Sequence, residues 1–270
     1  AVAEYAKENS LGIQLHASET ASEHRECIER HGKTPMEWFE SLGVLDVPVT
    51  AAHCVWVSDS DIALMADKKV SAVHCPISNL KLASGIMRIN EVMRGGVNVA
   101  LGTDGASSNN RLDMLREMQT AAVLHKGVNL DPTIMTASQT YKIATQNGAI
   151  AQRRYDCGEI AVGNRADLVL INCDSVNNLP MYDAYSMLAY SASSSDVLMT
   201  MVDGEVLYQN GEHKTIDVEK IKVASTRALT DRIKDVFENH PLFGEIPILS
   251  ASDTLQHTPL ISSVNSLSCV

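Results

Sequence analysis

The stretch Leu15-His16-Ala17-Ser18-Glu19-Thr20 ends a short apolar run with a histidine, and a glutamate follows three residues later. Three further apolar runs end in a similar way, at Ala52-His53-Cys54, Val73-His74-Cys75-Pro76 and Gly102-Thr103-Asp104-Gly105. Short apolar runs separated by amphipathic segments predict parallel strands joined by helices. Because the carboxyl ends of parallel strands meet at one edge, we expect these four polar endings to lie on the same face of the molecule.

The alternation of strand and helix patterns extends to about residue 150 and predicts an α/β fold with right-handed crossovers. Strands are expected at 11–15, 47–52, 70–73 and 97–101. Helices are expected at 22–31, 36–42, 59–68, 86–94, 112–126 and 133–145, with a loop at 76–85.

The pattern changes after residue 150 to short strands with turn residues. A strand is expected at 167–171, followed by a hairpin whose turn is Asp203-Gly204. One helix is expected at 218–237, and the Ser- and Thr-rich tail at 248–270 is expected to be peripheral. The sequence thus predicts three parts: 1–150, 151–215 and 216–270.

Composition narrows the function classes. The 270 residues carry 33 acidic against 22 basic side chains, a net charge of −11, and no basic stripe, which argues against nucleic-acid binding. Six cysteines without a CxxC pair favour a reducing cytoplasm. No apolar run reaches the ~20 residues of a membrane span. We expect a cytoplasmic protein without nucleic-acid or membrane partners, and homo-oligomer formation stays open.

His16 and Asp104 are the first candidates for a metal site. A neutral imidazole and a carboxylate suit zinc or iron, and catalytic zinc takes three or more protein ligands. Taken singly, His16 is better explained as an ordinary strand-end histidine, and Asp104 can be explained as a turn aspartate before Gly105. Their repeated placement at strand ends favours a metal-hydrolase site.

Other polar residues at the same edge suggest proton transfer. Glu19 could face the metal cavity and exchange protons, or serve only as a first-turn glutamate of the next helix. His53 could bind the metal or hold its water. Ser108 belongs to a polar group that could line the site or merely form a capped loop. His74 is expected to be a structural histidine that bonds the backbone near Pro76, and the other histidines need no function.

Several longer motifs resemble the amidohydrolase superfamily. The matching stretches are His16-Ala17-Ser18-Glu19, Ala52-His53-Cys54, His74 to Gly85, Gly102 to Asn110, Asn147-Gly148-Ala149 and Gly163 to Leu168. The most similar branch is that of the 5-methylthioadenosine/S-adenosylhomocysteine deaminases, near the chlorohydrolase-like enzymes. The resemblance extends from about Leu11 to Lys214.

This resemblance implies the C-terminal half of a metal-dependent-hydrolase TIM-type barrel and a small β-sandwich portion. It implies that His16 and Asp104 are ligands of Zn²⁺, with Fe²⁺ as the alternative. Glu19 would protonate the ring of a purine nucleoside, His53 would orient the hydrolytic water, and Asp104 would accept its proton. Glu19, Asp104 and Ser108 would contact the substrate, which loses ammonia.

The sequence departs from the family in one respect, because it contains no His-x-His pair. In the family that pair supplies two zinc ligands from the first barrel strand. We therefore expect the sequence to belong to a longer protein, and the chain alone to bind little or no zinc and not to turn over. The alternatives are a chlorohydrolase or another heterocycle deaminase of the superfamily, or a non-catalytic fragment.

Overall fold

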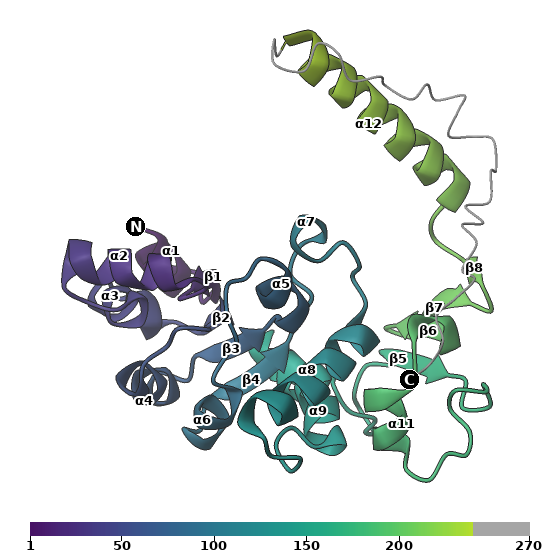
Figure 1. Cartoon of the computed structure of the whole chain (residues 1–270), viewed down its shortest axis with the longest axis horizontal. Coiled ribbons are helices and arrows are strands. Elements are labelled where there is room, and N and C mark those ends of the chain that lie inside the picture. Colours follow the sequence, from purple (N-terminus) through teal and green to yellow (C-terminus); the bar gives the residue numbers. More distant parts are fainter. Residues whose placement is uncertain (240–270) are drawn as a thin grey trace, which may run out of the picture. The chain divides into compact units, whose positions relative to one another are not determined.

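The computed structural model describes residues 1–239, with side chains through Arg232 (Figure 1). Its contacts divide the chain into two units, 1–214 and 215–270. The first unit contains two four-stranded sheets. The second contributes helix α12 (Val218–Asn239), close to the helix expected at 218–237. The tail at 248–270 lies outside the described residues.

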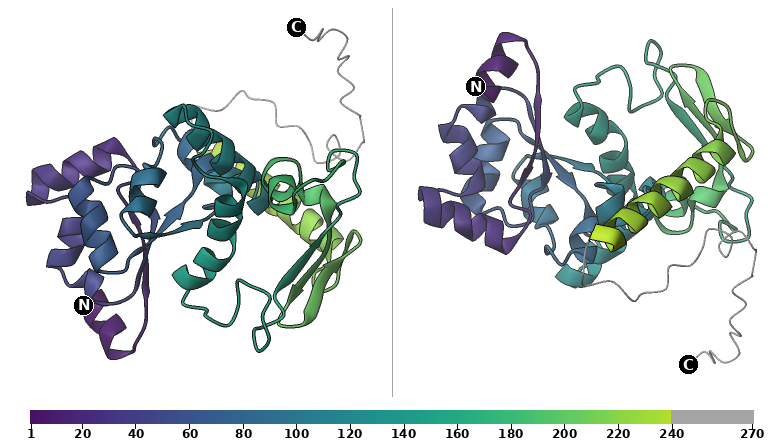
Figure 2. Two further views of the ribbon diagram at one scale, coloured as in Figure 1. Left: turned by 90° about the horizontal axis from the view of Figure 1, so that it is seen from below. Right: turned by 90° about the horizontal axis from the view of Figure 1, so that it is seen from above.

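The first sheet is parallel throughout and has the order β1-β2-β3-β4. Its strands are β1 (Ile13–Ala17), β2 (Val49–His53), β3 (Ser71–His74) and β4 (Asn98–Leu101). Figure 2 shows that early helices (purple to blue) and later helices (teal) flank these strands from two sides. The predicted α/β fold with a parallel sheet is confirmed, and the carboxyl ends of the four strands meet at one edge.

Side-chain caps explain where several connecting helices begin. Thr20, Thr34 and Ser58 each accept a hydrogen bond from the third helical residue, whose acidic side chain bonds back to the cap backbone. Such caps each stabilise a helix by about 1 kcal/mol. The helices of this part are α1 (Val2–Glu8), α2 (Ala21–His31), α3 (Pro35–Ser41), the 3₁₀ turn η1 (Val44–Asp46), α4 (Asp59–Asp67), α5 (Pro76–Lys81), α6 (Ile89–Arg94), α7 (Ala106–Asn109), α8 (Met114–Asn129), α9 (Ala137–Ala144) and α10 (Gln146–Ala151).

Two of the differences from the sequence-based expectation concern where helices begin. The expected loop at 76–85 begins with helix α5, where Pro76 occupies the first turn, a position at which its missing N–H has no cost. The helix expected from 133 starts later, at Ala137, because Thr136 caps it. The Asp131 side chain instead holds a turn by accepting hydrogen bonds from the backbone and hydroxyl of Thr133.

The main hydrophobic core lies between the parallel sheet and its helices. Ala51 and Ala72 are fully buried small residues of the sheet, and Met36 and Met65 are fully buried on α3 and α4. Gly102 follows β4, and a Cβ atom added to this glycine would lie only 2.7 Å from Val73 Cγ1. This glycine therefore lets the chain that leads to Asp104 run close to β3.

The second sheet is antiparallel, in the order β5-β6-β7-β8. Its strands are β5 (Leu168–Ile171), β6 (Val197–Val202), β7 (Glu205–Gln209) and β8 (Glu212–His213). The expected hairpin is present, with Asp203 and Gly204 at positive φ in its turn. Helix α11 (Ala184–Tyr190), which the sequence pattern did not predict, and the 3₁₀ turn η2 (Ser194–Asp196) connect β5 to β6. Helix α11 packs against α8 and α9, which joins this part to the first.

Candidate metal centre

His16, His53 and Asp104 converge at the carboxyl edge of the parallel sheet. Each offers one ligand atom, and these atoms lie within 4.8 Å of one another. The two imidazole rings are 5.1 Å apart between centroids. His53 is almost fully buried, Asp104 is partly buried and His16 is exposed. The three side chains come from β1, from β2 and from the loop after β4, so only the folded sheet brings them together.

The chemistry of this group suits a divalent transition metal. Two imidazole nitrogens and one carboxylate oxygen are ligands that zinc and iron accept. Three protein ligands also match the number that catalytic zinc sites use while keeping a position open. The donor set of His16, His53 and Asp104 therefore fits such an ion.

The backbone at this edge adopts unusual conformations. Ser18, His53 and Asp104 have φ angles of 50°, 71° and 61°, in the left-handed region that non-glycine residues rarely occupy. Each such residue costs on the order of 1 kcal/mol or more, and they cluster at functional sites. Ala52 pairs with His16 in the parallel register, so these two side chains lie on the same face of the sheet. In a regular strand, the next residue, His53, would point to the opposite face, away from His16. The left-handed backbone at His53 breaks that alternation and allows the two imidazoles to approach.

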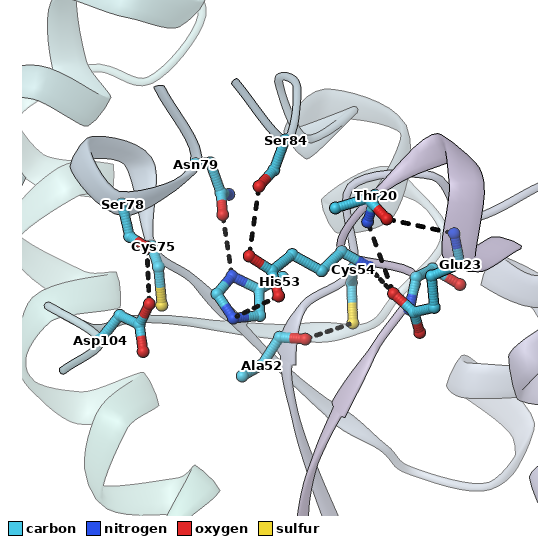
Figure 3. A network of polar contacts seen from close by, with 12 residues as sticks. Thr20, Glu23, Ala52, His53, Cys54, Cys75, Ser78, Asn79, Ser84 and Asp104 are labelled. Carbon is cyan, nitrogen blue, oxygen red and sulfur yellow. Dashed lines mark hydrogen bonds and ion pairs between the residues drawn. The ribbon is translucent and has the colours of Figure 1, made fainter. Parts of the chain in front are cut away.

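Glu23 fixes the loop that carries Glu19. Its carboxylate accepts hydrogen bonds from the backbone N–H groups of Ser18 at 2.9 Å, of Glu19 at 2.6 Å and of Thr20 at 3.4 Å. Figure 3 shows Glu23 beside Thr20 at the start of α2. Because one carboxylate holds three consecutive N–H groups, the loop after β1 has a single defined course.

The Glu19 carboxylate points toward His53. Its Oε2 lies 3.7 Å from His53 Nε2, and its Oε1 accepts a hydrogen bond from the Ser84 hydroxyl at 3.2 Å. Its side chain keeps 24 % of its surface exposed. Glu19 is therefore both held in place and accessible, which suits a group that exchanges protons.

Asp104 is kept anionic by its neighbours. Desolvation raises the pKa of this carboxyl group, but hydrogen bonds from the Ser78 hydroxyl, the Gly105 backbone and the Ser108 hydroxyl outweigh it, so the pKa lies below its ordinary value. The Ser78 hydroxyl donates to Asp104 Oδ2 at 2.6 Å (Figure 3). Ser108, on the short helix α7, thus lies beside Asp104.

Asn79 holds the other side of the His53 ring. Its Oδ1 lies 2.8 Å from His53 Nδ1, and both residues are 1 % exposed (Figure 3). The sequence pattern predicted no individual role for Glu23, Ser78, Asn79 or Ser84. The available signal was the concentration of short polar residues in the segment just after β3.

His74 does not join the metal group. Its Nε2 lies 2.9 Å from Nε2 of His125, a residue of α8, and both rings are buried. Desolvation lowers the pKa of both imidazoles, that of His125 to about 4. His74 is thus structural, as expected, but its partner is His125 rather than the backbone near Pro76. The spacing Met118, Ala122 and His125 places this histidine on the buried face of α8 and could have revealed it.

In the part of the chain that the structure describes, no helix has both the length and the apolar character required to cross a bilayer.

Comparison with known proteins identifies the family. The model of the amidohydrolase family matches residues 1–207. The chain belongs to the amidohydrolase family. Among its curated relatives are 5-methylthioadenosine/S-adenosylhomocysteine deaminases of Acetivibrio thermocellus, 48 % identical over 82 % of this chain, and of Moorella thermoacetica, 44 % identical over 84 %. This amidohydrolase chain covers 51 % and 54 % of those proteins, about half their length.

Solved structures of the family agree with this fold. An adenosine deaminase from Xanthomonas campestris with bound zinc superposes with a TM-score of 0.82 at 36 % identity, covering 86 % of this chain and 53 % of that one. Atrazine chlorohydrolase from Arthrobacter aurescens, complexed with zinc, gives 0.77 at 26 % identity, covering 84 % and 50 %. Both are similar to this chain over about half of their own length.

Proposed function

We propose that this chain acts in the hydrolytic deamination of adenine nucleosides of the 5-methylthioadenosine/S-adenosylhomocysteine type. The observation that carries the proposal is the convergence of His16, His53 and Asp104 within 4.8 Å, with Glu19 facing His53. The curated relatives at 44 % and 48 % identity bear this activity in their names. Within this proposal the parallel strands form the C-terminal half of a TIM-type barrel, and β5–β8 belong to a β-sandwich portion.

His16 and Asp104 would hold the cation, for which we propose Zn²⁺, with Fe²⁺ as the alternative. Zinc is present in the two solved relatives described above. When bound, such an ion supplies Lewis acidity and makes water a nucleophile near neutral pH. The anionic Asp104, stabilised by Ser78, suits this position because a cation needs a deprotonated ligand.

The remaining roles follow from the positions of the side chains. His53 accepts a hydrogen bond from the attacking water at Nε2, and Asp104 takes up the proton that this water loses. Glu19 donates a proton to the purine ring nitrogen while water adds to the amino-bearing carbon. Ser108, beside Asp104, contacts the substrate together with Glu19 and Asp104. Asp104 then passes the proton taken from the water to the amino group, the C–N bond breaks and ammonia leaves. The added hydroxyl returns a proton to Glu19, so that an inosine-type product remains.

A second candidate is hydrolysis of another heterocycle. The fold similarity to atrazine chlorohydrolase favours it, although that protein is only 26 % identical over the matched region. A Glu19-type carboxylate serves either reaction, because both add water to a carbon of an aromatic ring. The third reading is a non-catalytic fragment.

Three steady-state assays separate these readings. We would incubate the chain, and a fusion placing the first half of the Acetivibrio relative before Ala1, with 5-methylthioadenosine, S-adenosylhomocysteine and adenosine, and follow ammonia release. Guanine, followed by ammonia release, and atrazine, followed by chloride release, serve as alternative substrates. Deamination of adenine nucleosides by the fusion supports the proposal. Activity only on atrazine or guanine supports the second candidate. No turnover by a folded, metal-loaded fusion supports the fragment.

We further propose a cytoplasmic location, homo-oligomer formation and the three-part division at 1–150, 151–215 and 216–270. The cysteine pattern supports the location. Sedimentation of the purified protein tests the oligomer, and limited proteolysis tests the division, with first cuts expected near residues 150 and 215.

A further inference from the structure

The segment from α5 to Ser84 holds two side chains of the proposed site at once. Asn79 Oδ1 lies 2.8 Å from His53 Nδ1, and the Ser84 hydroxyl donates to Glu19 Oε1 at 3.2 Å. The Ser84 backbone N–H donates to the Asn79 carbonyl at 2.8 Å, and Glu19 Oε2 faces His53 Nε2 at 3.7 Å. These four contacts form a closed ring of Asn79, His53, Glu19 and Ser84. Figure 3 shows the Asn79–His53 contact of this ring.

The Asn79–His53 contact has a chemical consequence for the imidazole. An amide oxygen only accepts hydrogen bonds, so His53 Nδ1 has to donate. A neutral imidazole that carries its proton on Nδ1 presents a lone pair on Nε2. Free histidine prefers the other tautomer in water, with the proton on Nε2. The Asn79 oxygen therefore opposes the intrinsic preference of the ring.

The opposite tautomer would disable the centre. If Nε2 carried the proton, it would present an N–H to the group formed by His16 and Asp104, where a cation or the proton of a water needs a lone pair. Glu19 Oε2 would favour this tautomer as an acceptor, but at 3.7 Å it lies beyond hydrogen-bond distance. Within the described residues, the contact with Asn79 at 2.8 Å is therefore the stronger one.

We propose that Asn79 is a positioning residue that fixes His53 as the Nδ1–H tautomer, so that Nε2 directs its lone pair into the metal centre. The proposal deepens the proposed function and rests on it for its catalytic meaning. The tautomer itself is a property of the chain alone. Asn79 is suited to this task because it is 1 % exposed on α5, so bulk water does not compete for its oxygen.

The test is a long-range ¹H–¹⁵N correlation spectrum of the histidine rings in the metal-free 270-residue chain. It is recorded at pH about 8.5, roughly two units above an ordinary imidazole pKa. A His53→Gln variant assigns the His53 signals. We expect His53 to show a protonated Nδ1 and an unprotonated Nε2. A protonated Nε2 in the wild-type chain would overturn the proposal, because the amide would then be presenting its nitrogen to the ring.

Two variants of similar size separate the hydrogen bond from packing. Asn79→Asp keeps an acceptor oxygen and should keep the Nδ1–H tautomer. Asn79→Leu removes the acceptor and should shift most of the population to Nε2–H, and Asn90→Leu on α6 serves as the control. Retention of Nδ1–H in Asn79→Leu would also contradict the proposal. If Asn79→Leu does not fold, the spectra of the wild-type chain and of Asn79→Asp still test the proposal, because both should show the Nδ1–H tautomer of His53.

Titration of the fusion with Zn²⁺ provides a second readout. Loss of a partner that orients a histidine at a metal centre typically lowers metal affinity or activity 10- to 100-fold. We expect a loss of about that size in Asn79→Leu, and little change in Asn79→Asp or Asn90→Leu. Equal affinities in all four proteins would count against a role for Asn79 at the centre. If the chain shows the expected tautomer but the folded, metal-loaded fusion does not deaminate nucleosides, only the proposed function is contradicted.

Discussion

The neighbouring strands β2 and β3 both end in a buried histidine, yet the two histidines occupy opposite chemical environments. His53 is 1 % exposed and lies between Asn79 and the Glu19 carboxylate, close to His16 and Asp104. His74 is fully buried, and its one hydrogen-bond partner among the described residues is His125. The same residue type at the same edge of one sheet thus serves a candidate reaction in one case and packing in the other.

The difference arises from the elements that cover each strand end. The loop after β1 and helix α5 supply His53 with a carboxyl group and an amide acceptor, whereas α8 supplies His74 with a second imidazole. Without a carboxyl partner, desolvation lowers the pKa of His74 and of His125, which keeps both rings neutral. A histidine at a strand end therefore identifies a site only together with the charges around it.

The largest expected effect concerns Glu19, whose carboxyl group lies beside His53. Glu19→Gln should lower kcat for nucleoside deamination by about 10²- to 10⁴-fold, because the amide keeps the shape but cannot transfer a proton. Stability should change little, because Gln has nearly the same size and its amide oxygen can still accept the hydrogen bond from the Ser84 hydroxyl. Activity is measured by ammonia release and stability by thermal unfolding of the same fusion. Glu29→Gln, on the exposed face of α2, is the control, and an unchanged kcat in Glu19→Gln would remove this residue from the reaction.

The second effect concerns the pH dependence of the buried histidine pair. The pKa of His125 is about 4 in the fold against an ordinary 6.5, because the fold disfavours the charged ring. Above pH 6.5 the ring is neutral in the folded and unfolded chain, and the full stability is present. As pH falls from 6.5 towards 4, the unfolded chain binds the proton first, and this stability is lost. Because each pKa unit corresponds to about 1.4 kcal/mol, His125 alone can account for about 3 kcal/mol. Urea unfolding at pH 7.0 and 4.5 should reveal most of this loss.

The matched variant for this effect replaces both rings, since removing one would leave a buried nitrogen of the other without its partner. His74→Leu/His125→Leu should have a visibly flatter dependence of unfolding free energy on pH than the wild-type chain. His213→Gln, an exposed histidine of β8, should retain the wild-type slope. The same slope in all three proteins would show that the pair does not resist protonation.

The third effect is metal-dependent stabilisation. We expect little or no zinc on the chain alone, and measurable Zn²⁺ binding by the fusion, in which His16 and Asp104 hold the ion with His53 beside them. Zinc at 100 times its dissociation constant should add about 2.7 kcal/mol to the free energy of unfolding. Asp104→Asn and His16→Gln should abolish this increment, whereas His74→Gln should retain it. Loss of the increment in His74→Gln as well would mean that the two histidine environments are not distinct.

The strands and most of the candidate site were predictable because they depend on local patterns. Apolar runs ending in His16, His53 and Asp104 define both the parallel strands and their shared edge. The roles of Asn79 and Ser84 were not predictable in this way. Asn79 meets His53 across 26 residues, and Ser84 meets Glu19 across 65. Such contacts depend on the path of α5 over the sheet, and the segment that contains α5 reads as a loop from its Pro, Ser and Asn content.

His74 illustrates the same limit from the opposite direction. Its position in the pattern equals that of His53, so periodicity cannot distinguish the two residues. What distinguishes them is the pairing of β3 with α8, which brings His125 over His74. That pairing is a tertiary contact across 51 residues. Sequence patterns thus located the edge of the sheet, but the different roles of His53 and His74 at that edge could be told apart only in the fold.

The smallest effect concerns Ser84, which orients the Glu19 carboxylate without touching the proposed metal group. Ser84→Ala removes the hydroxyl that donates to Glu19 Oε1, so the carboxylate should sample orientations turned away from His53. A hydrogen bond to a charged group is worth about 1.5–3 kcal/mol, and a partial loss should lower kcat about tenfold with KM nearly unchanged. Ser84→Thr keeps the hydroxyl and should restore most of the rate, whereas Ser107→Ala, an exposed serine of α7, should match the wild type. A rise in KM with an unchanged kcat would show that Ser84 shapes the binding surface rather than the proton-transfer geometry. The difference between the His53 and His74 environments would then involve the His53 ring but not the positioning of the Glu19 carboxylate.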